Sequence, residues 1–328
     1  MPVVSESLTG RNLTMEAARV SAAGALGASE MMGRGDDQAA DQAAVDAMHN
    51  ALDTVMIDGT IQFGEGEEDQ APKLFTGEKV GIGEGPKVDV ALMPIEGPTI
   101  VAKGAPNALS IFTMTEEGGF LNVPDIYMNK IAIGSGLPDD LVSLDEEVSV
   151  NLNALAKAKG VEVGDLLVCI LDRPRHGELL AKVRETGARI RLIVDGDVNG
   201  VIATNLPHSP VDIYLGIGGA RQGVLAAAAM SCIGGHMQGK LVIRSGDDER
   251  QAMACGITDI TQTYGVHDMA SGDVTFATTG ITTGPMLRGV HKDLGVTVSH
   301  SMVLRHRTGT LRYIESHHQF ASRVTNSG

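Results

Sequence analysis

Apolar residues along the first part of the chain recur at the spacing of a helix face. This pattern runs from Thr14, a plausible N-terminal cap, to about Met32, and again from about Asp37 to Val55. The segment "GRGD" separates the two stretches, so we expect a helical hairpin. The buried face of the second helix is predicted to carry Ala40, Ala44, Val45, Met48 and Leu52.

The rest of the chain shows the patterns of strands and of strand–helix alternation. Residues 88–115 contain apolar runs that predict successive strands of one sheet. From residue 165 onward, strands such as "DLLVCIL" and "ARIRLIV" alternate with helical segments, which favours an α/β sheet covered by helices. We predict an N-terminal α+β domain over residues 1–150 that holds a metal site, and a C-terminal α/β domain over residues 151–328 that ends in a short polar tail.

Composition and charge exclude several classes of partner. The chain has 328 residues and a formal net charge of −15, which disfavours nucleic acid and anionic membranes, and any phosphate site must be locally positive. The cysteines Cys169, Cys232 and Cys255 are widely spaced and lie in apolar surroundings, as expected for reduced thiols. No apolar run is long enough to span a membrane and no signal peptide is evident, so we expect a cytoplasmic protein.

The segment "GEGEED" is the first candidate for chemistry. Its acids Glu65, Glu67 and Asp69 stand beside glycines that permit a tight turn, and converging carboxylates suit a hard cation. The alternative is a solvated acidic loop.

Further charged residues follow two predicted strands. Arg173 and Arg175 could clamp a phosphate group, or could be exposed residues at a helix start capped by Asp172. Asp195 and Asp197 could bind sugar hydroxyls or a metal, or could cap the next helix. The segment "GIGGARQG" lacks the third glycine of a dinucleotide-binding turn, so a Rossmann site is rejected.

Together, ordered blocks over nearly the whole chain resemble the class II fructose-1,6-bisphosphatases. They include "IDGTIQFGEGEEDQAPKL", "PIEG", "PDIYMNK", "LDRPRH", "RLIVDGDV", "GIGG" and "FATTGIT". The resemblance implies the layered αβαβα sandwich shared with inositol monophosphatases, and a homodimer or homotetramer. It also implies Mg²⁺- or Mn²⁺-dependent hydrolysis of the 1-phosphate of fructose 1,6-bisphosphate, and in some members of sedoheptulose 1,7-bisphosphate.

The resemblance also implies roles for individual residues, carried over by motif. The metal ligands are Asp41, Glu65 and Glu96, and the acids that handle the attacking water are Glu67 and Asp69. The substrate-binding residues are Tyr127, Arg173, Arg175, Asp195, Gly196 and Asp197.

Several positions depart from the family pattern. Met93 replaces a ligand Asp, Pro98 replaces a Thr that orients the water, and Asp37 replaces a Lys. Where the family has Pro-Glu, this chain has Arg221 and Gln222. A thioether is a poor ligand for Mg²⁺ and proline has no hydroxyl, so we expect a phosphatase of weakened or lost activity. The alternative is a sugar-phosphate-binding, regulatory or structural homologue without catalysis.

Overall fold

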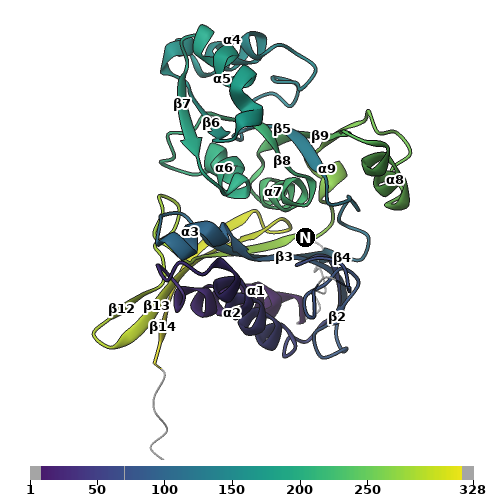
Figure 1. The fold of residues 1–328 in the computed structure, drawn as a ribbon, viewed down its shortest axis with the longest axis vertical. Helices are drawn as coiled ribbons and strands as arrows, with labels where there is room; N and C mark the ends of the chain where they lie inside the picture. Colours follow the sequence, from purple (N-terminus) through teal and green to yellow (C-terminus); the bar gives the residue numbers. More distant parts are fainter. Residues whose placement is uncertain (1–8, 70, 320–328) are drawn as a thin grey trace, which may run out of the picture.

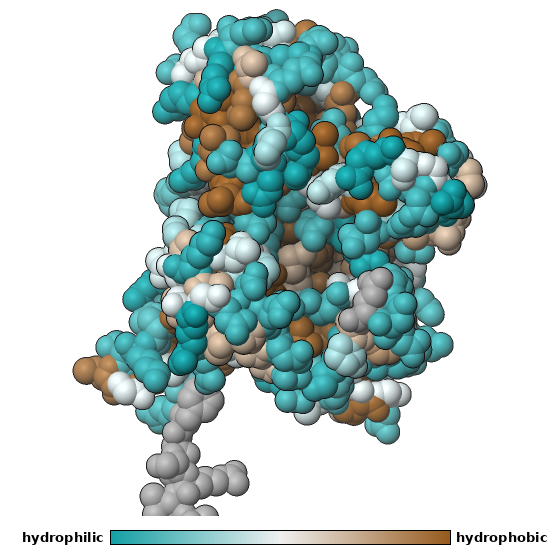
Figure 2. All heavy atoms as spheres, in the orientation of Figure 1, coloured by the Kyte–Doolittle hydropathy of each residue, from teal (hydrophilic) through white to brown (hydrophobic). Residues whose placement is uncertain are grey.

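The computed structural model describes residues 9–69 and 71–319. The predicted polar tail comprises residues 319–328, and all of it except Gln319 lies outside the described residues. No helix among the residues described is both long and apolar enough to cross a membrane. The face visible in Figure 2 is mostly hydrophilic, in keeping with the charged composition.

The described residues form helices and strands in an order that mixes both types throughout. The helices are α1 Thr9–Ser29, α2 Asp37–Leu52, α3 Pro98–Lys103, α4 Val148–Lys159, α5 Gly177–Glu185, α6 Asp197–Ile202, α7 Ala220–Ile233, α8 Gly246–Ala254 and α9 Val266–Met269. The strands are β1 Asp58–Phe63, β2 Lys79–Val80, β3 Lys87–Glu96, β4 Leu109–Glu116, β5 Tyr127–Ile133, β6 Leu167–Leu171, β7 Arg189–Ile193, β8 Ile213–Gly219, β9 His236–Val242, β10 Thr263–Gly265, β11 Thr275–Gly280, β12 His291–Asp293, β13 Val296–Arg305 and β14 Thr310–His318.

Two sheets alternate with three layers of helices (Figure 1). The α1–α2 hairpin covers the outer face of the first sheet, α6 and α7 lie between the sheets, and α4 and α5 cover the outer face of the second. The alternation of side chains explains this order: along β3, Val90 and Leu92 pack toward α1, whereas Ala91 between them belongs to the central core around α7. The predicted αβαβα sandwich is confirmed.

The first sheet gathers strands from both ends of the chain. Its order is β12-β13-β11-β4-β3-β1-β2, with β14 paired to β13, and the second sheet runs β10-β9-β5-β8-β6-β7. Residues 275–318 therefore join the sheet that contains residues 58–116, because β11 pairs antiparallel with β4. The division of the chain near residue 150 stays a prediction.

Two local expectations were wrong. Helix α1 begins before Thr14, which is buried inside it rather than capping it. The successive strands predicted within residues 88–115 are present as β3 and β4, which pair in one sheet, but the apolar run between them forms α3. It does so because Gly97 takes a left-handed backbone (φ 91°) and Pro98 occupies the first helical position. Proline is well suited there, since its fixed φ matches the helix and its missing amide hydrogen has no helical partner.

Candidate functional site

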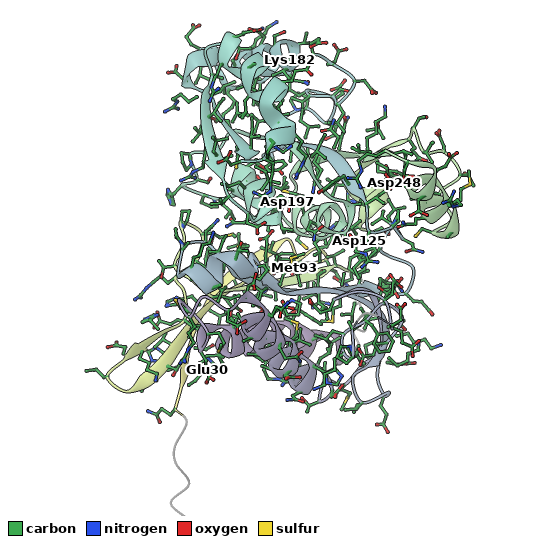
Figure 3. All side chains as sticks on the ribbon, in the orientation of Figure 1. Glu30, Met93, Asp125, Lys182, Asp197 and Asp248 are labelled. Atoms are coloured by element: carbon green, nitrogen blue, oxygen red, sulfur yellow. The ribbon has the colours of Figure 1, made fainter. Side chains whose placement is uncertain are left out.

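A cleft of about 670 Å³ lies where residues from the two sheets meet. Its first wall comes from α2, the turn after β1, the end of β3 and the start of α3, and its second wall from residues around β5, β6, β7 and the β8–α7 junction. Figure 3 labels Met93 on the first wall and Asp125 and Asp197 on the second.

The cleft brings together most of the residues chosen from the sequence. The lining residues include the predicted ligand-binding residues Asp41, Glu65, Glu96, Tyr127, Arg173, Arg175, Asp195 and Asp197. They also include the residues that differ from the family pattern, namely Asp37, Met93, Pro98, Arg221 and Gln222. Glu67, Asp69 and Gly196 are not among its lining residues. Gly196 is nevertheless adjacent, because a β-carbon there would come within 3.6 Å of Glu96 Oε2.

Asp41 of α2 and Glu65 of the acidic turn form a hydrogen-bonded pair of carboxyl groups. Burial and the nearby charge of Asp41 raise the pKa of Glu65 to about 8. Burial also raises the pKa of Asp41. Two carboxylates held together in this way keep a proton between them near neutral pH, and a cation can take the place of that proton.

Glu96 ends β3 and links the first sheet to α6. It is only 3% exposed, and its Oε1 accepts a hydrogen bond of 2.8 Å from the amide of Val198. Its Oε2 is buried and has no hydrogen-bond partner among the described residues. Burial, and then the charge of Asp197, raise the pKa of Glu96 to about 8.

These acids fit one divalent cation better than a full metal cluster. The Asp41–Glu65 pair supplies oxygen ligands of the kind Mg²⁺ and Mn²⁺ prefer, and the unsatisfied Oε2 of Glu96 is a further oxygen donor. Yet no three His, Cys, Asp or Glu side chains in the described part of the chain stand close enough to hold a metal. Met93 and Gln222 line the same cleft without a carboxylate.

The arginines of the second wall are held by main-chain carbonyls. Arg175 donates from Nε and Nη2 to the carbonyl of Ile217, at 2.9 and 2.7 Å. Arg173 donates to the carbonyls of Asp172 and Val194 and lies 3.7 Å from Asp195. Fixed guanidinium groups at a cleft can recognise a phosphate group with little loss of side-chain entropy.

Two arginine side chains lie close to the ring of Tyr127, and sequence reasoning missed one of them. The guanidinium carbons of Arg175 and Arg244 lie 4.7 and 4.5 Å from the centre of its ring. Arg244 lies two residues after the end of β9, and its position just beyond a strand was the available signal.

Lys130 is a second residue that the sequence analysis missed. Its side chain is 1% exposed, donates to Gly219 O at 2.9 Å and forms an ion pair with Asp197. A lysine alternating with Met128 and Ala132 in the buried strand β5 was the signal for this role. The pair fixes the orientation of the Asp197 carboxylate at the floor of the cleft.

Arg221 and Gln222, which differ from the family pattern, lie at the start of α7. Arg221 Nη2 is 2.7 Å from Glu67 Oε1, so this acid of the turn pairs with an arginine. The Gln222 amide folds over Gly219, where an added β-carbon would stand 1.8 Å from Gln222 Oε1. A larger residue at position 219 would therefore require the Gln222 side chain to turn away.

Comparison with known proteins agrees with the geometry. The family model for bacterial fructose-1,6-bisphosphatase, glpX-encoded, matches residues 11–318. The chain is 40% identical over 322 residues to the fructose-1,6-bisphosphatase 1 class 2 of Escherichia coli (strain K12), with 94% of this chain and 95% of that protein covered. The fructose-1,6-bisphosphatase class 2 of Shigella flexneri gives the same figures, 40% identity with 94% and 95% coverage. The chain belongs to the bacterial, glpX-encoded family of class 2 fructose-1,6-bisphosphatases.

Proposed function

We propose that the cleft binds fructose 1,6-bisphosphate or a closely related sugar bisphosphate, and that hydrolysis of its 1-phosphate is strongly slowed or lost. The observation that carries this proposal is the composition of the cleft. Arginines suited to phosphate line it together with Met93, Pro98 and Gln222, which lack the groups that the family resemblance expects for metal and water.

Retained binding is supported by the second wall. Arg173 and Arg175 supply cations for a phosphate group, and Asp195 and Asp197 supply acceptors for sugar hydroxyls. The Lys130–Asp197 ion pair holds one of these acceptors in place before a ligand arrives. Such preorganisation lowers the entropy lost on binding.

Slowed hydrolysis follows from Met93 and Pro98 on the first wall and from Gln222 on the second. Catalysis of phosphoryl transfer depends on positioning and on charge stabilisation, and removing several members of one such unit is not compensated by those that remain. Pro98 cannot orient a water molecule through a hydroxyl, and neither Met93 nor Gln222 adds a negative charge for a cation.

A second candidate is a working phosphatase that uses a single divalent ion, Mg²⁺ or Mn²⁺. It is favoured by the Asp41–Glu65 pair, because raised pKa values are typical of carboxyl groups in functional sites, where a cation can replace the bound proton. The Asp41–Glu65 pair would hold the ion. When bound, it would polarise a phosphoryl oxygen and lower the pKa of a bound water.

The experiment is phosphate release from fructose 1,6-bisphosphate by the purified protein, with Mg²⁺ and then Mn²⁺. An Asp41→Ala, Glu65→Ala double variant is the matched control, and calorimetry measures ligand binding by both proteins. Binding without phosphate release is expected. Release that the double variant abolishes would favour the single-ion phosphatase, and a folded protein that neither binds nor hydrolyses the sugar would contradict both candidates.

We further propose that the chain assembles as a homodimer or homotetramer. This rests on the family resemblance alone, and light scattering of the purified protein measures it. A monomer at micromolar concentration would contradict it.

A further inference from the structure

Arg221 is a partly buried cation on the cleft wall. Its side chain is 13% exposed, and its Nη2 pairs with Glu67 Oε1 at 2.7 Å. Its Nε is buried and has no hydrogen-bond partner among the described residues. An unsatisfied buried donor is costly, so an acceptor that reached this guanidinium would be bound favourably.

The start of α7 adds positive potential at the same place. Helix α7 has fourteen residues, and Gly219 precedes it without a side-chain cap. Peptide dipoles place partial positive charge at the first turn of such a helix. Arg221 and Gln222 stand where the family pattern has Pro and Glu, and each difference makes this turn more positive.

We propose that Arg221 is the fixed cation that binds a phosphate group of the sugar bisphosphate, so that the chain holds its ligand without a divalent ion. A guanidinium presents five N–H donors in a rigid plane and keeps its charge at all physiological pH values. It can therefore supply part of the positive charge that a metal ion would bring if the missing carboxylates were present to bind it. This inference rests on the proposed function, because it assumes that the cleft takes a sugar phosphate.

Calorimetric titration with fructose 1,6-bisphosphate, first in EDTA and then with Mg²⁺, tests the proposal. The unaltered protein should bind in EDTA. Arg221→Ala should weaken that binding by about tenfold to a hundredfold, the effect of losing a charge-assisted hydrogen bond. Arg250→Ala is the matched control, since Arg250 is an exposed arginine of α8 that pairs with Asp247, and it should leave binding unchanged.

Two further variants separate ligand binding from a structural role. Arg221→Gln keeps much of the side-chain length without the charge, and should lose binding even if Arg221→Ala folds poorly. Glu67→Gln weakens the ion pair and should leave binding as tight or tighter, because the guanidinium is released toward the ligand. A purely structural ion pair would instead make Glu67→Gln as damaging as Arg221→Ala, which would overturn the proposal.

The failure of this inference is distinguishable from failure of the proposed function. Binding that requires Mg²⁺ and is unaffected by Arg221→Ala would overturn the role of Arg221 while leaving a sugar-phosphate site. Absence of binding both in EDTA and with Mg²⁺ would overturn the proposed function itself.

Discussion

Individual residues in this cleft can lose a chemical role without disturbing the fold. Pro98 is the clearest case, because the first position of α3 has no helical partner for an amide hydrogen and tolerates proline well. Met93 likewise packs against the central core, so its apolar side chain adds contacts while it adds no oxygen ligand. The substitutions are therefore compatible with a stable protein that has little phosphatase activity.

We predict that Met93→Asp, Pro98→Thr and Gln222→Glu together raise phosphatase activity on fructose 1,6-bisphosphate. Restored carboxylates would add ligands for a divalent ion and the hydroxyl would orient a water molecule, an effect on the order of a hundredfold or more in kcat. Phosphate release with Mg²⁺ measures it. The same triple variant carrying Asp41→Ala should stay inactive, and a folded triple variant no faster than its parent would refute the assignment of these positions.

The buried Lys130–Asp197 ion pair should be important for stability. Lys130→Met would leave a carboxylate buried without its cation, and breaking a buried pair in this way costs about 3–5 kcal/mol. Urea unfolding followed by circular dichroism measures the loss. Lys182→Met is the control, since Lys182 is an exposed lysine that pairs with Glu178 and should change stability little. Equal effects of the two substitutions would argue against the buried pair.

At the scale of elements, the α1–α2 hairpin is packed closely through glycine. A β-carbon at Gly27 of α1 would stand 2.4 Å from the carbonyl oxygen of Ala43 and 2.9 Å from Ala47 Cβ, both in α2. The helices can approach this closely only because no side chain intervenes. Since α2 carries Asp41, the packing of the hairpin also sets the position of one wall of the cleft.

We predict that Gly27→Ala destabilises the protein, although alanine is the better helix former by about 1 kcal/mol. The main-chain contact cannot relax easily, and overpacking of this kind costs about 1–3 kcal/mol. Thermal unfolding should show a lower Tm. Gly177→Ala at the start of α5 is the control, because a β-carbon there meets no atom within 4 Å, and its Tm should stay the same or rise.

At the scale of the whole molecule, the site exists because the two sheets meet across the α6–α7 layer. The first wall belongs to the sheet that gathers both ends of the chain, and the second wall belongs to the sheet between them. Glu96 connects the two through its hydrogen bond to the amide of Val198. Any ligand that contacts both walls should therefore stabilise the arrangement of the sheets as well as its own site.

We predict that divalent ions alone stabilise the folded protein only slightly. If Mg²⁺ or Mn²⁺ at a concentration equal to its dissociation constant binds the folded state alone, it adds about 0.4 kcal/mol. In a protein of this size that raises Tm by roughly 1–2 °C at most. Calorimetric melting at increasing ion concentration measures the shift. A much larger rise would contradict the view that few ligands remain, and its loss in Asp41→Ala would locate the ion.

The sequence by itself determined the helical hairpin and the alternating strands, and through its family resemblance it determined the layers and most of the residues of the site. Periods of apolar residues predicted the helical hairpin and the alternating strands, because a half-buried element must repeat its apolar side at its own period. Ordered motifs identified most of the carboxylates, the arginines and the substituted positions that lie together in the cleft.

Only the tertiary structure decided that residues 275–318 return to the first sheet, since strand pairing depends on partners distant in sequence. It also decided that Lys130 pairs with Asp197, Arg221 with Glu67, and Glu96 with the start of α6. Each of these contacts joins residues more than 60 positions apart, a distance over which local pattern carries no information.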